Sequence, residues 1–220
     1  MPDAFFLTEP ACYRLLAAEG LPIPPHFLAH SPEEAAEKAA LLGFPVVLKI
    51  VSPQVVHKSE AGGVRLALAD AEAVRQAYRA VESSVHAFRP EAVIEGMLLL
   101  PQFQGGTELI VGGLRDVQFG PTVMFGLGGI FVELLKDVSF RVAPIDVAEA
   151  AEMIREIKGY PLLNGFRGRL PLDLETLAAF LADLSRLMER HPEIEELDLN
   201  PVFLFPKGLA IADARIKAAA

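Results

Sequence analysis

Cysteine is almost absent from this sequence, since Cys12 is the only one among 220 residues. A single cysteine excludes an intramolecular disulfide framework. The lack of disulfides is typical of proteins in a reducing compartment. No apolar run approaches the roughly 20 residues that span a bilayer, and the N-terminus carries no basic and apolar targeting pattern. We therefore expect a cytoplasmic protein that makes no membrane contact.

Basic residues are fewer than acidic ones, which gives a net charge of −9 and a pI near 5.1. A nucleic acid would be repelled by such a protein unless a local basic face compensated, so we expect no nucleic-acid partner. Internal repeats and the standard phosphate-binding motifs are also absent. There is no G-x-x-x-x-G-K-[ST] segment, and residues 125–130 do not form a dinucleotide G-x-G-x-x-G motif. The hydrophobic fraction of 52% is ample for a buried core.

An apolar strand that carries one lysine stands out in the first half of the chain. Residues 46–50 read Val-Val-Leu-Lys-Ile, and a polar loop with two adjacent glycines follows before the apolar run at 64–69. Burying the ammonium group of Lys49 without a partner costs several kcal/mol. We therefore expect an acidic residue or an anionic ligand to meet it.

The loop after this strand offers the groups that an anion needs. Backbone N–H groups at Gly62 and Gly63 can approach a ligand closely. The side chains of His57, Lys58 and Ser59 add cationic and hydroxyl donors. The pattern favours a hairpin that holds phosphate. The alternative is a surface hairpin in which the strand lysine forms a salt bridge with a carboxylate.

Helix starts are marked clearly in this half of the chain. Thr8 precedes a proline in the first turn of one predicted helix, and Ser31 does the same for a second. Asp70 is the expected N-cap of a third helix, in which apolar residues recur at helical spacing. These helices alternate with apolar strands, which indicates an α/β pattern.

Strands dominate the second half. Four apolar stretches read as successive strands, at residues 92–101, 108–111, 122–125 and 138–143. Short glycine turns between them favour an antiparallel sheet. Two helices and then three short strands follow, at residues 147–158, 174–190, 194–199, 202–205 and 209–212. We expect a mixed α+β and α/β protein of two lobes, a small one over residues 1–103 and a larger one over residues 104–220.

Oxygen ligands gather near the C-terminus. Alternation along the strand at 194–199 places Asp198 and Asn200 on one face, and the hairpin that follows brings Asp213 to the neighbouring strand. Two carboxylates and an amide oxygen suit Mg²⁺ and leave positions for phosphate oxygens. The alternative is that these are solvent-facing residues of an edge hairpin.

A lysine and glycine loop in one lobe and oxygen ligands in the other describe a nucleotide clamped between two lobes. Glu108 follows a Gly-Gly turn between the lobes, where its carboxylate could accept hydrogen bonds from ribose hydroxyls. The backbone of residues 100–103, which include Gln102 and Phe103, could form the hinge that binds adenine. Both assignments rest on position in the chain.

Six segments, in order along nearly the whole chain, carry a family resemblance: Phe-Pro-Val-Val-Leu-Lys-Ile at 44–50, His-Lys-Ser-Glu-Ala-Gly-Gly-Val at 57–64, Gly-Thr-Glu-Leu-Ile-Val-Gly at 106–112, Phe-Gly-Pro-Thr-Val-Met-Phe-Gly-Leu-Gly-Gly-Ile at 119–130, Leu-Asn-Gly-Phe-Arg-Gly at 163–168, and Asp-Leu-Asn-Pro with Asp-Ala-Arg-Ile at 198–216. Together they resemble the ATP-grasp β subunit of ADP-forming acetyl-CoA synthetase, a family related to succinyl-CoA synthetase. The resemblance implies an ATP-grasp fold and the reversible reaction of acyl-CoA, ADP and phosphate to acid, ATP and CoA through a phosphohistidine.

The resemblance also implies roles for single residues. Lys49 would hold the nucleotide phosphates, and Asn200 and Asp213 would bind Mg²⁺ with Asp198 nearby. Glu108 would bind the ribose of ATP or ADP.

Three further residues match positions of the family. His57 occupies the place of a loop histidine that accepts and relays the phosphoryl group, while Arg141 and Arg167 could neutralise the transferring phosphate. A neutral histidine is a competent nucleophile near pH 7. One departure is the sequence Leu-Pro-Gln at 100–102, where relatives often carry Gln-Glu-Met.

The two lobes use nearly all of the chain, which leaves no room for a CoA-binding domain. We therefore expect a partner α subunit that carries the CoA and acyl sites, in a hetero-oligomer such as an α₂β₂ heterotetramer. Two other functions compete with this one. The first is a nucleotide-sensing ATP-grasp domain without turnover, associated with a protein acetyltransferase or a CoA-binding protein. The second is a carboxylate–amine ligase, which the CoA-ligase-like motifs disfavour.

Overall fold

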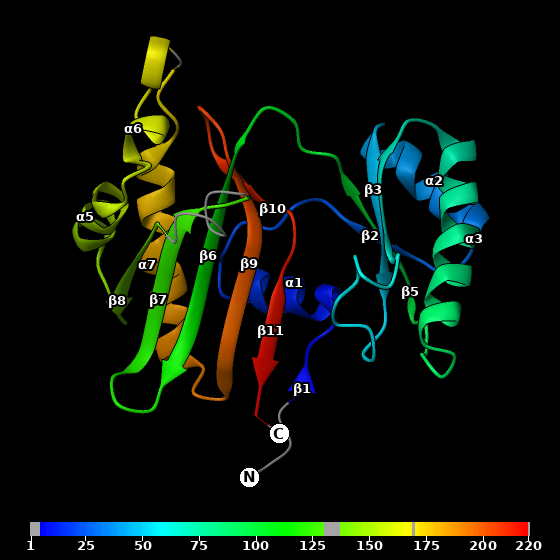
Figure 1. Cartoon of the computed structure of the whole chain (residues 1–220), viewed down its shortest axis with the longest axis horizontal. Helices are drawn as coiled ribbons and strands as arrows, with labels where there is room; N and C mark the ends of the chain where they lie inside the picture. Colours follow the sequence, from blue (N-terminus) through cyan, green and yellow to red (C-terminus); the bar gives the residue numbers. More distant parts are fainter. Residues whose placement is uncertain (1–4, 130–136, 169, 220) are drawn as a thin grey trace. The chain divides into compact units, whose positions relative to one another are not determined.

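The computed structural model describes residues 5–129, 137–168 and 170–219 (Figure 1). The chain divides into two compact units. The larger unit contains Met1–Leu7, Cys12–Ile23 and Phe103–Ala220, and the smaller contains Thr8–Ala11 and Pro24–Gln102. The two units divide between Gln102 and Phe103, whereas the expected lobes divide after residue 103, and most of the first 23 residues belong to the larger unit. The physical reason is strand pairing, because the N-terminal strand pairs with the last strand of the chain.

The smaller unit is a four-stranded antiparallel sheet in the order β2-β5-β3-β4 with two helices. Its strands are β2 (Phe27–Ala29), β3 (Val46–Val51), β4 (Val64–Leu68) and β5 (Gly96–Pro101), and its helices are α2 (Pro32–Leu42) and α3 (Ala71–Phe88). Ser31 and Asp70 cap these helices by accepting hydrogen bonds from the amides of Glu34 and Ala73, as their sequences predict.

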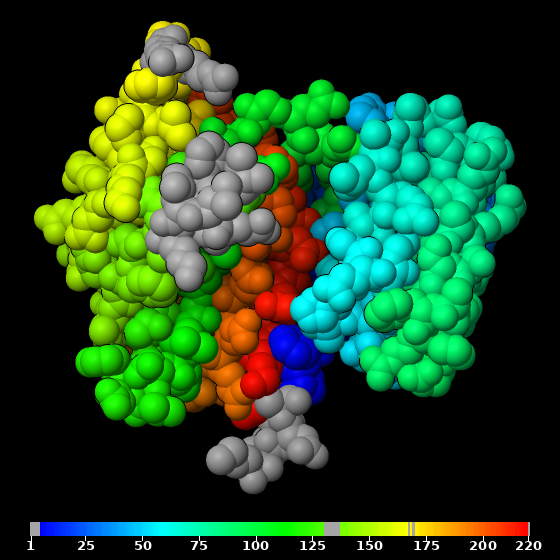
Figure 2. Space-filling model, in the orientation of Figure 1, coloured from blue at the N-terminus to red at the C-terminus, as the bar shows by residue number. Residues whose placement is uncertain are grey.

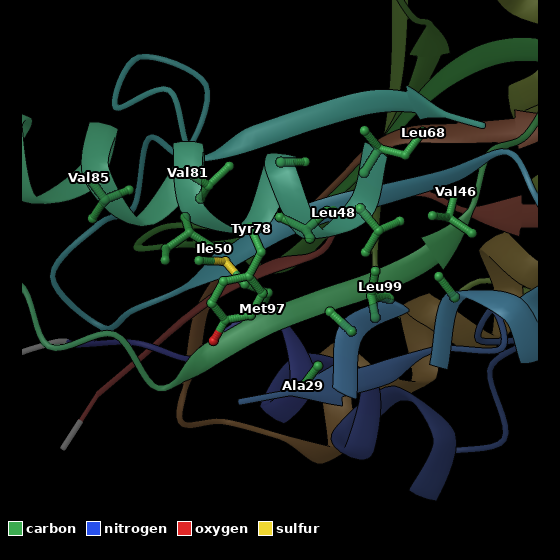
Figure 3. Packing of buried hydrophobic residues seen from close by; sticks show 14 of the residues in the cluster. Ala29, Val46, Leu48, Ile50, Leu68, Tyr78, Val81, Val85, Met97 and Leu99 are labelled. Atoms are coloured by element: carbon green, nitrogen blue, oxygen red, sulfur yellow. The ribbon is translucent and has the colours of Figure 1, made fainter. Parts of the chain in front are cut away.

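The core of the smaller unit explains why β3 is apolar along its whole length. All six residues of β3 are buried. Leu48 and Ile50 pack with Val81 of α3 and with Leu99 of the neighbouring strand β5, as Figure 3 shows. The alternate residues Val47, Lys49 and Val51 point to the opposite face of the strand and are buried as well. Lys49 is therefore held in an almost entirely apolar strand.

The larger unit is built on a seven-stranded antiparallel sheet in the order β1-β11-β9-β6-β7-β8, with β10 paired to β9. Its strands are β1 (Phe5–Phe6), β6 (Thr107–Asp116), β7 (Gly120–Leu127), β8 (Val138–Val142), β9 (Ile194–Leu204), β10 (Leu209–Ile211) and β11 (Arg215–Ala218). Its helices are α1 (Glu9–Ala18), α5 (Val147–Glu156), α6 (Tyr160–Leu163) and α7 (Leu174–Arg190), with a 3₁₀ turn η1 (Phe166–Gly168). The first three residues of α1, Glu9, Pro10 and Ala11, belong to the smaller unit.

Strand β9 corrects one prediction. The sequence predicts two strands on either side of Asn200 and Pro201, whereas the structure has one strand that runs through them. The register with β6 shifts at this point, so that Leu199 pairs with Val111 and Val202 pairs with Leu109. Such a bulge accommodates a proline, which cannot donate a hydrogen bond to the ladder.

Helices α5 and α7 lie on the same face of this sheet (Figure 1). The extent of α7 matches the predicted helix, and its apolar face includes the buried residues Leu177, Leu181 and Leu184. Arg115 of β6 closes the end of α7 by donating to the carbonyl groups of Met188 and His191. A guanidinium group at this end also complements the helix dipole. Among the described residues, no helix has the length and apolar character needed to cross a membrane.

An ionic cluster joins the C-terminal ends of α1 and α7. Nε2 of His191 lies 3.0 Å from the carboxylate of Glu19, and Nδ1 lies 2.7 Å from that of Glu193. Hydrogen bonds that the imidazole donates to Glu19 and, to a smaller extent, to Glu193 raise the pKa of His191 above its usual value. The carboxylate of Glu19 also pairs with Arg190, and its own pKa is lowered, chiefly by His191.

We predict that Glu19→Gln destabilises the protein more at pH 6 than at pH 9. A histidine whose pKa is raised on folding contributes its full stability below its unfolded pKa of about 6.5, and this contribution is lost as the pH rises through the folded pKa. The carboxylates are ionised at both pH values, so the difference between them isolates His191. We expect a difference of up to about 1 kcal/mol in urea unfolding. Glu37→Gln, in an exposed position of α2, is the control. Equal losses at the two pH values would contradict the assignment.

Candidate functional site

Lys49 meets a buried carboxylate. Its Nζ donates to Oε1 of Glu9 at 2.8 Å, and the side chain of Lys58 donates to Oε2 of the same glutamate. Lys49 is only 7% exposed, and Glu9 is also buried. The acidic partner that the buried lysine requires is therefore present, and we call these three residues the Glu9–lysine cluster. Sequence reasoning missed Glu9, which it treated only as part of a helix start 40 residues upstream of the lysine.

The two glycines of the loop serve the packing of the loop itself. The amide of Gly63 donates to the carbonyl of Lys58 at 2.7 Å, and that of Gly62 donates to Ser59 at 3.1 Å. A Cβ atom at position 63 would lie 2.4 Å from a methyl group of Ile50, and Gly62 has a φ of +65°. This differs from the expectation that these amides point at a phosphate, because loop closure already uses them. The same tight turn holds Lys58 against Glu9.

His57 lies in this loop with its side chain 66% exposed. Nδ1 of its imidazole lies 3.9 Å from Oε1 of Glu60. That separation exceeds hydrogen-bond length. The imidazole is thus presented to solvent, which an exchange of phosphoryl groups with another molecule requires.

The predicted oxygen ligands share one face of the larger sheet. Leu197 and Leu199 of β9 are buried against the helices, so Asp198 and Asn200 project from the opposite face, as alternation requires. We call this opposite side the open face. Asp198 lies beside Gly112 of β6 and Arg215 of β11 in the ladder.

Asp213 lies in the short connection between β10 and β11 rather than on a strand of a hairpin. The amide of its neighbour Ala212 donates to the carbonyl of Pro201 at 2.9 Å, which holds this connection beside the bulge of β9. Burial raises the pKa of Asp198, Arg215 opposes the rise, and the negative charges of Asp213 and Glu196 add to it. Like charges near Asp198 favour a cation there, and Arg215 already lies 3.4 Å from its carboxylate.

The donor chemistry of this group fits Mg²⁺. Asp198, Asp213 and Asn200 offer two carboxylates and an amide oxygen, and Mg²⁺ in nucleotide sites takes one or two carboxylates together with water and phosphate oxygens. A cage made by the protein alone is not formed. Within residues 5–129, 137–168 and 170–219, no group of three or more histidine, cysteine, aspartate or glutamate side chains could hold a metal ion.

Glu108 stands on the open face, where it pairs in register with Phe203 of β9. Its carbonyl accepts a hydrogen bond from the amide of Gly128 at 2.7 Å. A Cβ atom at Gly129 would lie 3.2 Å from a carboxylate oxygen of Glu108. The glycines after β7 therefore allow the chain to pass closely over this glutamate.

The side chains of Gln102 and Phe103, in the predicted adenine hinge, make contacts within the protein. The side-chain oxygen of Gln102 accepts a hydrogen bond from the amide of Ala67, at a residue of β4 with a φ of +56°. Phe103 packs against Phe203 and Phe205, with ring centroids 5.9 and 6.5 Å away. Only the backbone groups of these two residues can therefore serve as a hinge while these contacts persist.

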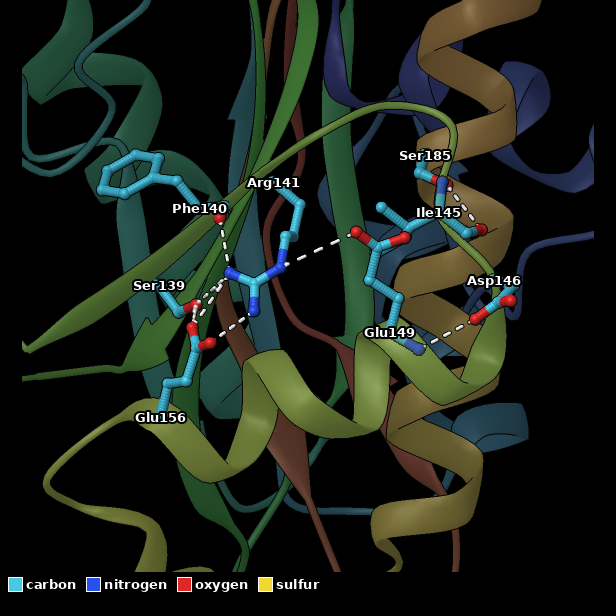
Figure 4. Close-up of polar contacts among 8 residues, drawn as sticks. All are labelled: Ser139, Phe140, Arg141, Ile145, Asp146, Glu149, Glu156 and Ser185. Carbon is cyan, nitrogen blue, oxygen red and sulfur yellow. Dashed lines mark hydrogen bonds and ion pairs between the residues drawn. The ribbon is translucent and has the colours of Figure 1, made fainter.

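Arg141 is engaged by a helix rather than presented to a ligand. Its guanidinium binds both carboxylate oxygens of Glu156 in α5, with 2.9 and 2.5 Å between the paired atoms (Figure 4). Ser139 donates to the same carboxylate, and the pKa of Glu156 is lowered, first by Arg141 and then by Ser139. This ion pair fastens α5 to β8, and the phosphate contact expected for Arg141 stays a prediction. Arg167 lies in η1, and its side chain is outside the described part of the structure.

This fold and these two groups of residues define the class of the protein. The chain belongs to the ATP-grasp domain family, whose sequence profile matches residues 3–218. It is 47% identical to the β subunit of ADP-forming acetate–CoA ligase I from Pyrococcus furiosus, over 96% of this chain and 90% of the relative. It is also 47% identical to ADP-forming acetate–CoA ligase I from Archaeoglobus fulgidus, where 92% of this chain matches 31% of a longer polypeptide.

A solved structure is similar over nearly the same length. Acetyl-coenzyme A synthetase 1 of Ca. Korarchaeum cryptofilum, in complex with coenzyme A and Mg-AMPPCP, has a TM-score of 0.84 and 47% identity. The match covers 97% of this chain and 92% of that one. Its phosphohistidine segment points towards the nucleotide-binding site. These findings confirm the fold class and the family resemblance that the motifs indicate.

We predict that Glu9→Gln destabilises the smaller unit by about 3 kcal/mol, because removing one partner from a buried ion pair leaves uncompensated charge. Urea unfolding followed by circular dichroism measures the loss. Glu60→Gln in the same loop is the matched control, since Glu60 is exposed. A loss no greater than that of the control would show that the two lysines do not depend on this carboxylate.

Proposed function

We propose that this chain is the nucleotide-binding β subunit of an ADP-forming acyl-CoA synthetase and that it exchanges phosphate between a phosphohistidine and ADP with Mg²⁺. The observation that carries the proposal is the Glu9–lysine cluster, a buried pair of lysines in the smaller unit of an ATP-grasp chain. The match to β subunits of this enzyme over almost their whole length supports the same assignment.

Phosphoryl transfer needs charge neutralisation and positioning more than covalent chemistry from the protein. In the proposed reaction the P–N bond of phosphohistidine breaks while an oxygen of the terminal phosphate of ADP forms the new P–O bond. Lys49 and Lys58 bind the phosphates, and Glu9 holds the two ammonium groups in place. Asp198, Asn200 and Asp213 hold Mg²⁺, which supplies further neutralisation of phosphate charge when bound.

Two further roles complete the proposed nucleotide site. Glu108 accepts hydrogen bonds from the ribose hydroxyls, because its carboxylate is exposed on the open face that also carries Asp198. The backbone of Gln102 and Phe103 binds the adenine ring. His57 relays the phosphoryl group between the partner and the nucleotide, and its exposure in the loop supports that role.

We also propose that a partner subunit supplies the CoA and acyl sites. The relative from Pyrococcus furiosus is named as a β subunit, and in Archaeoglobus fulgidus the matching segment is 31% of one longer chain. A separate CoA-binding α subunit in an α₂β₂ heterotetramer accounts for the first arrangement, and fusion of the same parts in one polypeptide accounts for the second. The test is reconstitution of this chain with such a subunit from the same organism, followed by an assay for acetate, ATP and CoA consumption.

We predict that Lys49→Met and Asp213→Asn each lower ATP-dependent acyl-CoA formation by the reconstituted complex at least about 100-fold, since each removes a charge that faces phosphate or metal. Lys38→Met and Asp183→Asn are matched controls. Lys38 forms a surface ion pair within α2, and Asp183 forms one within α7. Circular dichroism verifies that each variant folds. Full activity in either site variant would overturn the assignment of its residue.

For His57→Ala we predict loss of phosphoryl transfer with ATP binding retained, because the side chain is exposed and its removal leaves the Glu9–lysine cluster intact. Quench-flow with labelled ATP measures phosphorylation of the partner, and calorimetry measures nucleotide binding. His86→Ala, at an exposed position of α3, is the control. Phosphorylation of the partner at the wild-type rate without His57 would exclude the relay and leave the nucleotide site unaffected.

A further inference from the structure

Apolar side chains project from the open face of the larger sheet on three adjacent strands. Leu114 of β6, Met124 of β7, and Phe140 and Val142 of β8 project from it, and we call these four residues the apolar sheet face. The ladder register places Leu114 and Val142 on either side of Thr122, while Phe140 pairs directly with Met124. In Figure 2 atoms of the β6–β7 hairpin, coloured green, lie at the surface on this side.

The orientation of β8 follows from its polar neighbours. Ser139 and Arg141 bind Glu156 of α5, so the alternate residues Phe140 and Val142 point to the other side of the sheet. Figure 4 shows the ring of Phe140 directed away from α5. Met124 likewise lies over Gly112, where a Cβ atom would approach its methyl group to 3.5 Å.

The exposure of these side chains is high for a strand of a sheet. Phe140 is 57% exposed, Leu114 is 52% exposed and Val142 is 51% exposed. In the turn between β6 and β7, Phe119 is 66% exposed beside them. The polar residue Thr122 lies between Leu114 and Val142. Single exposed apolar residues are ordinary, but several of them on adjacent strands favour an interaction surface.

The same ladder rows connect the apolar sheet face with the candidate metal group. The row that contains Phe140 and Met124 continues through Gly112 of β6 to Asp198 of β9. Neighbouring strands are about 4.8 Å apart, so about 14 Å separates β8 from β9 in this direction. A polypeptide seated on the apolar part of the open face therefore lies within reach of Asp198.

We infer that the apolar sheet face is the docking surface for the CoA-binding partner subunit of the synthetase. This inference rests on the proposed function, which requires a partner to present a phosphohistidine to the nucleotide. A surface continuous with the metal group serves that delivery, because the docked subunit keeps its histidine segment close to the site of transfer. The apolar character supplies the binding energy, since burial of such side chains drives association.

The test uses the full chain and the recombinant CoA-binding subunit of the same organism. The double variant Leu114→Lys with Phe140→Lys places two charges in the apolar sheet face at exposed positions. We expect the variant to bind the partner at least 10-fold more weakly, because the centre of an interface tolerates charge poorly. A 10-fold change in Kd corresponds to about 1.4 kcal/mol of binding free energy. Calorimetry and analytical ultracentrifugation measure the association. ATP binding by the isolated variant should equal that of the wild type, and kcat should recover at saturating partner.

The matched control is Leu41→Lys with Phe88→Lys, which makes the same chemical changes at exposed positions of α2 and α3. It should associate like the wild type. If the Leu114→Lys with Phe140→Lys variant binds the partner as tightly as the wild type does, the inference is overturned and the proposed function is unaffected. A loss of self-association by this chain, with partner binding unchanged, would assign the face to a second copy and also overturn it. If the wild type itself neither binds the partner nor gains activity from it, the proposed function and this inference both fail.

Discussion

The buried ion pairs between Glu9 and two lysines are the constraint on which the candidate site depends. An ammonium group inside a strand whose six residues are all buried requires a compensating carboxylate. That need ties the first turn of α1 to β3 and to the loop after it. Gly62 and Gly63 meet the same need indirectly, because the tight turn they permit brings Lys58 to the second oxygen of Glu9.

The larger sheet separates its tasks by face and by strand. Its helix-covered face holds the hydrophobic core, and the bulge in β9 restores the inward direction of Val202 and Leu204 after Asn200. On the open face, acidic and amide groups gather on β9, whereas apolar side chains gather on β7 and β8. In the proposed enzyme the first set serves the nucleotide and the second serves the partner.

Local signals predicted much of this fold. Caps at Ser31 and Asp70, the extent of α7 and the antiparallel order of the second half follow from propensity and periodicity, which act over a few residues. The candidate site was predicted in part. Lys49 was recognised as a residue that needs an anion, but Glu9 was not identified as its partner. For Arg141, the sequence did not indicate its partner Glu156 of α5, whose two carboxylate oxygens accept hydrogen bonds from the guanidinium.

By itself the sequence determined the family of the protein and the positions of α2, α3 and α7, and it supplied the residues that are proposed to bind phosphate and metal. These properties depend on residue identity and on spacing along one element. Only the tertiary structure decided which carboxylate meets Lys49, that loop closure uses the amides of Gly62 and Gly63, and that apolar side chains from β6, β7 and β8 share one open face. Those outcomes depend on pairing between distant segments, since register and packing select partners that local sequence does not specify.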